Sequence, residues 1–247
     1  MSELPTSAGP RVLPTPPRAA TPAQLVAWAL ERFGTSRLVV TTAFGMEGCA
    51  LLDMIAAHRQ AVTVVYLDTH FFFPETHRLR ERLAARYPHL VFENRGTALT
   101  PDEQAARYGA ELWRRDPDHC CALRKVGPMR EALRGAELWM TALMRSQSPT
   151  RAALRPVEWD EQYALLKVNP LADWDRSAVW AYVQEHGVPY NELHGRGYPT
   201  IGCTHCTAPV AGSAPGSYTR VGRWADTAKT ECGLHVPASP PAGAAGQ

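Results

Sequence analysis

Apolar side chains recur at intervals of three and four residues along several stretches of the chain, the spacing of an amphipathic helix. In the first stretch, Thr21 is placed to cap a helix, Pro22 opens its first turn and Gly34 ends it. Five later stretches are also predicted to be helical: residues 49–58, 74–87, 101–108, 122–133 and 173–186.

Short runs rich in β-branched residues alternate with these helices and predict strands. The runs are residues 37–41, 62–67, 90–92, 137–141 and 165–168. This alternation predicts an α/β fold, a twisted parallel sheet with helices on both faces. Such sheets bind ligands beyond the carboxyl ends of their strands, so the loops that follow the strands should share a pocket. Those loops are residues 42–48, 68–74 and 142–151.

Periodicity is lost at both ends of the chain and again after about residue 190. Residues 1–22 and 237–247 are rich in Pro, Ala, Gly and Ser, and we expect disordered tails there. Residues 191–236 lack a regular pattern but carry cysteines and aromatic residues, which favours a functional segment. The α/β domain is therefore expected over residues 23–190.

Composition excludes several function classes. The 247 residues carry 26 Lys and Arg against 24 Asp and Glu, a net charge of +2 that favours neither nucleic acid nor a membrane surface as partner. We find no signal-peptide pattern and no apolar run long enough to span a bilayer. We therefore expect a cytoplasmic protein, in which the six cysteines stay reduced and need an explanation other than disulfides.

Four of the cysteines form two close pairs, Cys120-Cys121 and Cys203-x-x-Cys206. Four thiolates are the usual ligands of an iron–sulfur cluster or a structural zinc ion. Adjacent cysteines point apart in regular structure, which favours a cluster over one small ion. A redox dithiol at the C-x-x-C pair is a third interpretation. A further cysteine, Cys49, lies on an apolar helix face and is predicted to pack in the core.

Two loops that follow predicted strands offer binding chemistry. Residues 42–48 form a glycine-bearing turn that opens a helix, where free backbone N–H groups could hold a phosphate; a plain turn is the alternative. Asp68 follows the second strand and is suited to orient a loop, hold a ribose or cap a helix. Lys125, one turn past Cys121, would place a cation beside an anionic cluster.

Cys232 lies in the sequence Glu-Cys-Gly-Leu-His at the edge of the C-terminal tail. Cations upstream of it, Arg220, Arg223 and Lys229, would favour its thiolate form, so it is a candidate nucleophile. The alternative is an unreactive surface cysteine.

Taken together, these segments resemble the assimilatory sulfonucleotide reductases. The resemblance covers residues 37–236 and is to the cluster-bearing branch, the adenosine 5′-phosphosulfate (APS) reductases. The segments that carry it are residues 43–48, 67–69, 73–76, the two cysteine pairs, 139–151, 220–224 and 231–235. The chain departs from the family pattern at Ala43, His70, Ala142 and Met144.

The resemblance implies a Rossmann-like fold of the adenine nucleotide alpha hydrolase type and an assimilatory role in cysteine biosynthesis. It implies reduction of APS to sulfite and AMP through an S-sulfocysteine on Cys232, with thioredoxin or glutaredoxin as reductant. The alternatives are a reductase of 3′-phosphoadenosine 5′-phosphosulfate (PAPS), one that accepts both nucleotides, or a zinc-stabilised interaction domain without activity. Homo-oligomers are common among such enzymes.

The resemblance also assigns residues to the site. Cys232 and His235 are expected to be catalytic. A [4Fe-4S] cluster is expected on Cys120, Cys121, Cys203 and Cys206. The residues expected to bind substrate are Thr42, Gly45, Glu47, Leu67, Asp68, Thr69, Lys125, Arg145, Arg220 and Arg223.

Overall fold

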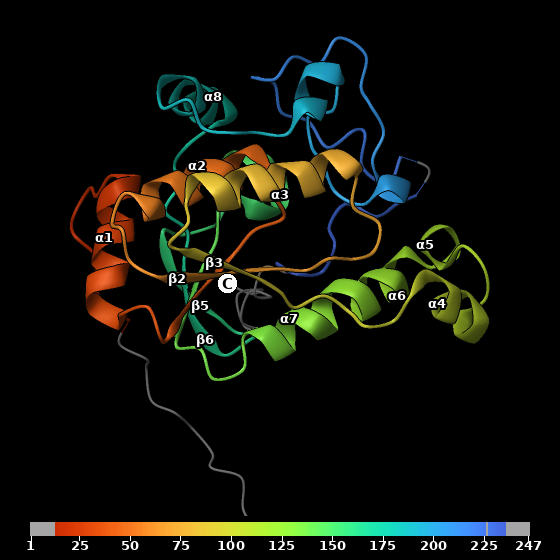
Figure 1. Ribbon diagram of the computed structural model, residues 1–247, viewed down its shortest axis with the longest axis horizontal. Coiled ribbons are helices and arrows are strands. Elements are labelled where there is room, and N and C mark those ends of the chain that lie inside the picture. Colours follow the sequence, from red (N-terminus) through yellow and green to blue (C-terminus); the bar gives the residue numbers. More distant parts are fainter. Residues whose placement is uncertain (1–12, 226, 236–247) are drawn as a thin grey trace, which may run out of the picture.

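The computed structural model describes residues 13–225 and 227–235, which fold around a six-stranded sheet (Figure 1). The strand order is β3-β2-β1-β4-β6-β5. Neighbouring strands are parallel except β5, which is antiparallel to β6. The strands are β1 (Leu38–Thr41), β2 (Val62–Tyr66), β3 (Leu90–Asn94), β4 (Leu138–Met140), β5 (Val157–Asp160) and β6 (Leu165–Val168).

Helices cover both faces of this sheet, as the alternation of elements predicts. In Figure 1, α2 and α3 lie on one side of the strands and α7 on the other. The longer helices are α1 (Pro22–Phe33), α2 (Met46–Ala56), α3 (Pro74–Arg86), α4 (Pro101–Tyr108) and α8 (Arg176–Glu185). The shorter ones are α5 (Leu112–Arg115), α6 (Pro117–Cys121), α7 (Gly127–Ala132), the π-helical turn η1 (Ala122–Val126) and the 3₁₀ turns η2 (Arg145–Gln147), η3 (Pro149–Arg151), η4 (Glu192–Arg196) and η5 (Thr204–Cys206).

The structure differs from the sequence-based prediction at several elements, among them α5, which was not predicted. Strand β5 was not predicted, although its four residues alternate between apolar and charged side chains, as is typical of a strand at the edge of a sheet. The helix expected over residues 122–133 is divided between η1 and α7, with α6 directly before it. Helix α2 begins at Met46, three residues before the predicted start. Gly45 is its N-cap residue and makes no side-chain hydrogen bond.

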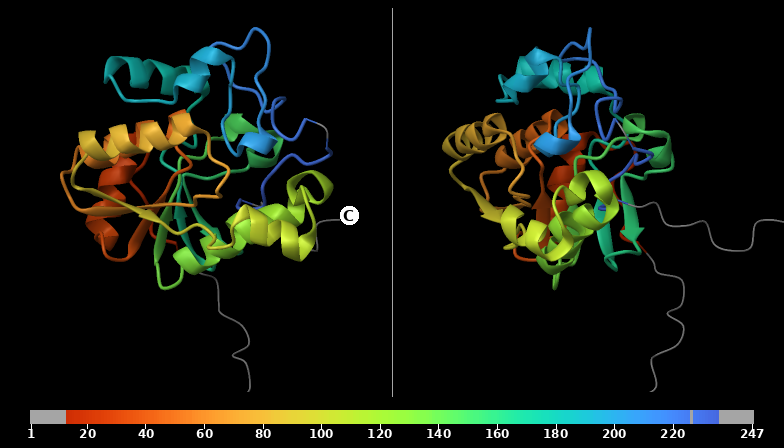
Figure 2. Two further views of the ribbon diagram at one scale, coloured as in Figure 1. Left: turned by 45° about the vertical axis from the view of Figure 1, so that its right-hand side comes forward. Right: turned by 90° about the vertical axis from the view of Figure 1, so that its right-hand side faces the viewer.

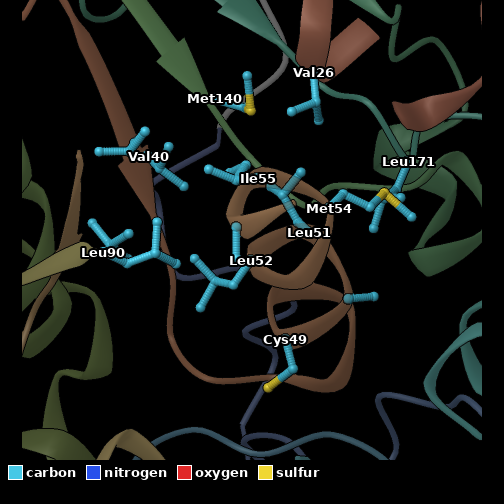
Figure 3. Packing of buried hydrophobic residues seen from close by; sticks show 14 of the residues in the cluster. Val26, Val40, Cys49, Leu51, Leu52, Met54, Ile55, Leu90, Met140 and Leu171 are labelled. Atoms are coloured by element: carbon cyan, nitrogen blue, oxygen red, sulfur yellow. The ribbon is translucent and has the colours of Figure 1, made fainter. Parts of the chain in front are cut away.

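Two hydrophobic clusters hold the layers together. The larger one joins α1, α2 and α8 to one face of the sheet, and Figure 3 shows Leu51, Leu52 and Ile55 of α2 directed toward Val40 and Met140 of the strands. Cys49 belongs to this cluster and is fully buried, which confirms it as a packing residue. The smaller cluster joins Met129, Leu133 and Trp139 on the opposite face.

The strand order creates a switch in direction beside β1. The chain runs from β1 outward through β2 to β3, and then returns to place β4 on the other side of β1. In doubly wound sheets the loops on either side of such a switch separate and leave a crevice for ligands. This topology therefore brings the loops after β1, β2 and β4 to one edge.

The tails expected from the sequence lie mostly outside the described residues, since the structure describes neither residues 1–12 nor residues 236–247. Of the expected N-terminal tail, Leu13 packs against the larger cluster and Pro22 already belongs to α1. None of the helices in the described part of the chain combines the length and apolar composition that crossing a bilayer requires.

Gly48 permits the tight turn between β1 and α2. A Cβ atom at this position would lie 2.6 Å from Oγ1 of Thr42, which accepts a hydrogen bond from the Phe44 N–H. We expect Gly48→Ala to lower the free energy of unfolding by about 1–3 kcal/mol through this overlap. Chemical denaturation measures the change. The matched control is Gly195→Ala, where a Cβ meets no atom within 4 Å, and equal losses in both variants would contradict the prediction.

Candidate active site

An open cavity of about 230 Å³ lies at the carboxyl edge of the sheet, at the switch beside β1. Its walls come from the loops after β1, β2 and β4 and from the C-terminal segment, residues 220–235. Eleven of the residues expected at the site line it: Thr42, Gly45, Glu47, Leu67, Thr69, Lys125, Cys203, Arg220, Arg223, Cys232 and His235. Segments far apart in the sequence therefore meet in one place.

The first wall of the cavity is the N-terminal end of α2. Phe44 has a positive φ of 58°, and the Thr42 side chain stabilises this turn by accepting the Phe44 N–H at 2.9 Å. Gly45 provides no side chain to cap the helix. The first backbone N–H groups of α2 thus remain available to an anion, and the helix dipole favours negative charge there.

Glu47, in the first turn of α2, would oppose an anion if its charge were uncompensated. Its carboxylate lies 3.2 Å from the guanidinium of Arg176 in α8, and both side chains are buried. Arg176 also donates to the carbonyl oxygens of Pro199 and Ser217. This buried ion pair neutralises Glu47 and ties the start of α2 to the chain that leads into the C-terminal segment.

Asp68 shapes the loop after β2 instead of lining the cavity. Its carboxylate accepts the His70 N–H at 2.8 Å, and its own N–H donates to Oδ1 of Asn94 at 3.1 Å. His70 takes a φ of 60°, a conformation that favours glycine, at a position where the family pattern often has glycine. Of the roles open to Asp68 in the sequence, the structure supports loop orientation.

The four paired cysteines line one small cavity of about 10 Å³, next to the first. Cys120 and Cys121 end α6, and the π-helical turn η1 follows them directly. Cys203 precedes the turn η5 and Cys206 ends it, and the Cys203 sulfur lies 3.2 Å from Oγ1 of Thr69. Because a π turn is wider than an α turn, it changes the direction of the side chains that follow the adjacent pair.

Burial makes this cysteine cavity unfavourable for isolated negative charge. It raises the pKa of Cys121 to about 12, and burial together with the neighbouring thiols raises the pKa of Cys120 and Cys206. Across residues 13–225 and 227–235, no group of three or more His, Cys, Asp or Glu side chains has the spacing that one metal ion requires. The four thiols instead surround a space, and their ionisation needs compensating positive charge.

Lys125 lies between the two cavities and lines both. Burial alone would lower its pKa, but the thiols of Cys203, Cys232 and Cys121 raise that pKa above its usual value. Lys125 therefore carries its charge where it can act on both the cysteine cavity and Cys232. Arg124, in contrast, is fixed by hydrogen bonds to the carbonyl of Thr69 and the side chain of Gln104, at 2.9 and 2.7 Å.

The C-terminal segment crosses the edge of the sheet and approaches α6 and η1, as the blue ribbon in Figure 2 shows. Lys229 forms an ion pair with Asp118 of α6. Arg223 donates to the carbonyl of Cys206 at 3.0 Å, and its guanidinium lies 4.5 Å from the ring centre of Trp224. Arg223 thereby connects the cysteine turn to the large cavity.

Cys232 and His235 occupy the last part of this segment. The His235 ring stacks on Trp139 of β4, with ring centres 4.9 Å apart and an angle of 19°. Burial, followed by the charges of Lys167, Arg151 and Arg220, holds the pKa of His235 well below its usual value. His235 is therefore a neutral imidazole near pH 7 and carries no charge to stabilise a thiolate.

Comparison with known proteins adds sequence and structural similarity to this geometry. Residues 37–209 match the family described as phosphoadenosine phosphosulfate reductase domain. The chain belongs to this family. The adenosine 5′-phosphosulfate reductase of Shouchella clausii is 44% identical over 86% of this chain and 87% of its own length. The phosphoadenosine 5′-phosphosulfate reductase of Gloeobacter violaceus is 45% identical over 87% and 88%.

The solved structures agree with this membership. The phosphoadenylyl-sulfate reductase of Candida auris is 34% identical, with a TM-score of 0.67 over 78% of this chain and 91% of that chain. The FMN adenylyltransferase of Candida glabrata, 14% identical with a TM-score of 0.55 over 76% of this chain and 61% of that one, shares the fold alone. The sequence-based assignments to the sulfonucleotide reductases and to a Rossmann-like α/β fold are confirmed.

One arginine of the loop after β4 lies elsewhere than expected. Arg145 does not line the large cavity: it pairs with Asp173 and donates to the carbonyl of Leu154 at 2.6 Å. Arg151 of the same loop lines it instead, and its guanidinium bonds the carboxylate of Glu231 at 2.9 Å. The sequence showed a loop rich in arginine but contained no signal for which arginine faces inward.

The buried state of His235 predicts a specific dependence of stability on pH. Because its pKa is lower in the folded chain, the unfolded chain takes up the proton first. The stability that neutral His235 contributes is then complete above about pH 6.5 and is lost as the pH falls toward the folded pKa. We expect His235→Gln to destabilise the protein at pH 7.5 and the difference to shrink on acidification. Urea denaturation across this range measures it, and parallel curves would contradict the prediction.

Proposed function

We propose that this protein reduces adenosine 5′-phosphosulfate to sulfite and AMP, with Cys232 as nucleophile and thioredoxin or glutaredoxin as reductant. The observation that carries the proposal is the position of Cys232. Its thiol lines the same cavity as Lys125, Arg223 and the open N-terminal end of α2. A polyanionic nucleotide and a sulfur nucleophile can therefore meet there.

The first step follows from the charges in the cavity. The Cys232 thiolate attacks the sulfur of the sulfate group, a Cys–S bond forms, and the S–O bond to the phosphate breaks with its electrons remaining on AMP. Lys125, Arg223 and the N–H groups of α2 are placed to stabilise the charge that moves to the phosphate oxygens. His235, a neutral imidazole in the same cavity, is our candidate for holding the Cys232 thiolate through a ring N–H.

The reductant carries out the second step. A thiolate of the partner attacks the Cys232 sulfur, sulfite leaves, and a mixed disulfide forms. The partner's second thiol then releases Cys232 and becomes part of the partner's own disulfide, so the two electrons come from the partner. A partner with reduced thiols fits the cytoplasm, where we propose that the enzyme acts.

We also propose that Cys120, Cys121, Cys203 and Cys206 hold a [4Fe-4S] cluster. The four thiols surround one cavity, and Lys125 and Arg124 line it with positive charge. A bound cluster would supply the positive iron charge that allows the buried thiols to ionise, and would join the α6–η1 turn to the η5 turn. In the proposed reaction the chain's own residues bind the nucleotide and carry out the sulfur chemistry.

PAPS is the alternative substrate, since relatives named for either nucleotide are about equally similar to this chain. The four cysteines favour APS, because the resemblance places such ligands in the APS reductases. Comparing kcat/KM for the two nucleotides distinguishes them. A preference for PAPS would retain the chemistry at Cys232 and reassign the substrate.

The proposed cluster predicts the effect of removing its ligands. Cys120→Ser, Cys121→Ser, Cys203→Ser and Cys206→Ser should each lose bound iron and most of the activity, because a hydroxyl is a poor replacement for a thiolate ligand. Iron and sulfide analysis and absorbance near 400 nm, typical of such clusters, measure the loss. Cys232→Ser is the matched control and should keep full iron. Retention of full iron by Cys121→Ser, or zinc in place of iron, would show the assignment to be wrong.

The proposed nucleophile predicts a covalent intermediate. Incubated with APS and no reductant, the protein should gain about 80 Da, the mass of one SO₃ group, on the peptide that contains Cys232. Cys232→Ser should keep its iron and bind AMP, yet lose turnover by several orders of magnitude. Peptide mass spectrometry locates the adduct. An adduct on Cys203 or Cys206 would move the chemistry to the C-x-x-C pair.

A further inference from the structure

Glu231, which directly precedes Cys232, has no part in the reaction described above, yet four side chains converge on its carboxylate. One oxygen accepts hydrogen bonds from Arg151 at 2.9 Å and from Arg220 at 3.2 Å. The other accepts from Ser148 at 3.1 Å and from Thr150 at 3.4 Å. Three of these donors belong to the loop after β4, so the contact joins the sheet edge to the C-terminal segment.

The exposure of these side chains separates this contact from an ordinary surface ion pair. The side chain of Glu231 is 15% exposed, against 9% for Arg151 and 19% for Arg220. The surface pair between Arg37 and Glu137 has a similar distance of 2.9 Å, but its side chains are 53% and 50% exposed. Partial burial reduces screening by water, so a charged contact here influences chain position more than one on the surface.

The segment around Cys232 depends on side chains for its position. Arg220 donates to the carbonyl of Thr230 at 2.8 Å, and Gln162 donates to the carbonyl of Gly233 at 3.2 Å. Gly233 has a positive φ of 82°, which turns the backbone directly after Cys232. Between these two anchors, the carboxylate of Glu231 contributes the charged contact, one residue from the nucleophile.

We propose that Glu231 is a positioning residue: Arg151 and Arg220 clamp its carboxylate and thereby hold Cys232 in the cavity. The role assigned to Cys232 in this inference rests on the proposed function. The single carboxylate of Glu231 offsets only one of these two guanidinium charges, so the clamp leaves net positive charge in the cavity beside Lys125, Arg223 and the end of α2. Breaking the clamp should release the segment and slow sulfur transfer, with little effect on nucleotide affinity.

The first test measures the position of the segment without any reaction. Glu231→Gln keeps the side-chain length and removes the charge. By hydrogen exchange and mass spectrometry on the intact holoprotein without nucleotide, we expect the backbone amides around Cys232 to exchange about tenfold faster in this variant. Glu137→Gln, which removes the surface pair with Arg37, is the matched control and should leave these amides unchanged. Equal exchange in wild type and Glu231→Gln would overturn the clamp.

The second test separates positioning from substrate binding. In single-turnover reactions with APS, Glu231→Gln should slow formation of the sulfo-adduct about tenfold while the Kd for AMP stays within about twofold of wild type. Glu231→Asp, which keeps the charge, should recover part of the rate. Combining Glu231→Gln with Arg151→Gln should cost little more than the worse single change, because both remove the same contact. A weaker Kd with an unchanged rate, or additive losses, would overturn the proposal.

The two tests also distinguish failure of the proposed Glu231 clamp from failure of the proposed function. If wild type forms no adduct with either APS or PAPS, the proposed reaction is wrong, whereas the exchange experiment still decides whether Glu231 holds the segment.

Discussion

The arrangement of the site depends on the parallel pairing of β1 with β2 on one side and β4 on the other. This pairing brings the loops after β1, β2 and β4 to the same edge of the sheet. Because β2 and β4 lie on opposite sides of β1, the direction in which the chain adds strands changes there. The resulting crevice exposes the N-terminal end of α2 and receives the C-terminal segment as its remaining wall. Gly48 lets α2 begin directly behind Thr42, so the helix end reaches the crevice.

Several charged side chains at this edge of the sheet form ion pairs with neighbours of opposite charge. Arg176 neutralises Glu47, and Arg151 and Arg220 share Glu231. Lys125 is different, because the groups that raise its pKa are thiols from both cavities. A half-buried cation facing thiols is suited to tune them electrostatically, which links the cysteine cavity to the chemistry proposed for Cys232.

The C-terminal segment has to meet two demands in the proposed mechanism. It must hold Cys232 against a nucleotide and then present the same sulfur to a protein reductant. Anchoring by side chains of Arg220, Gln162 and Glu231 suits both demands, since such contacts release with less rearrangement than a strand or helix. The stacking of His235 on Trp139 adds an apolar attachment at the end of the described segment.

The sequence alone determined the class of fold and the order of most elements, because helical and strand periodicity and the caps around Pro22 and Gly34 are local properties of the chain. Most of the residues gathered in the cavity were expected from the resemblance to a known family. The sequence could not show that Arg151 faces the cavity and Arg145 does not, nor that Asp68 orients a loop, because these outcomes depend on partners distant in sequence, such as Glu231, Asp173 and Asn94. The short strand β5 was missed although its four residues alternate between apolar and charged side chains; its antiparallel pairing with β6 is a contact that only the tertiary structure shows. The neutral state of His235 likewise follows from burial against Trp139 and the nearby charges of Lys167, Arg151 and Arg220, an environment that only the tertiary structure assembles.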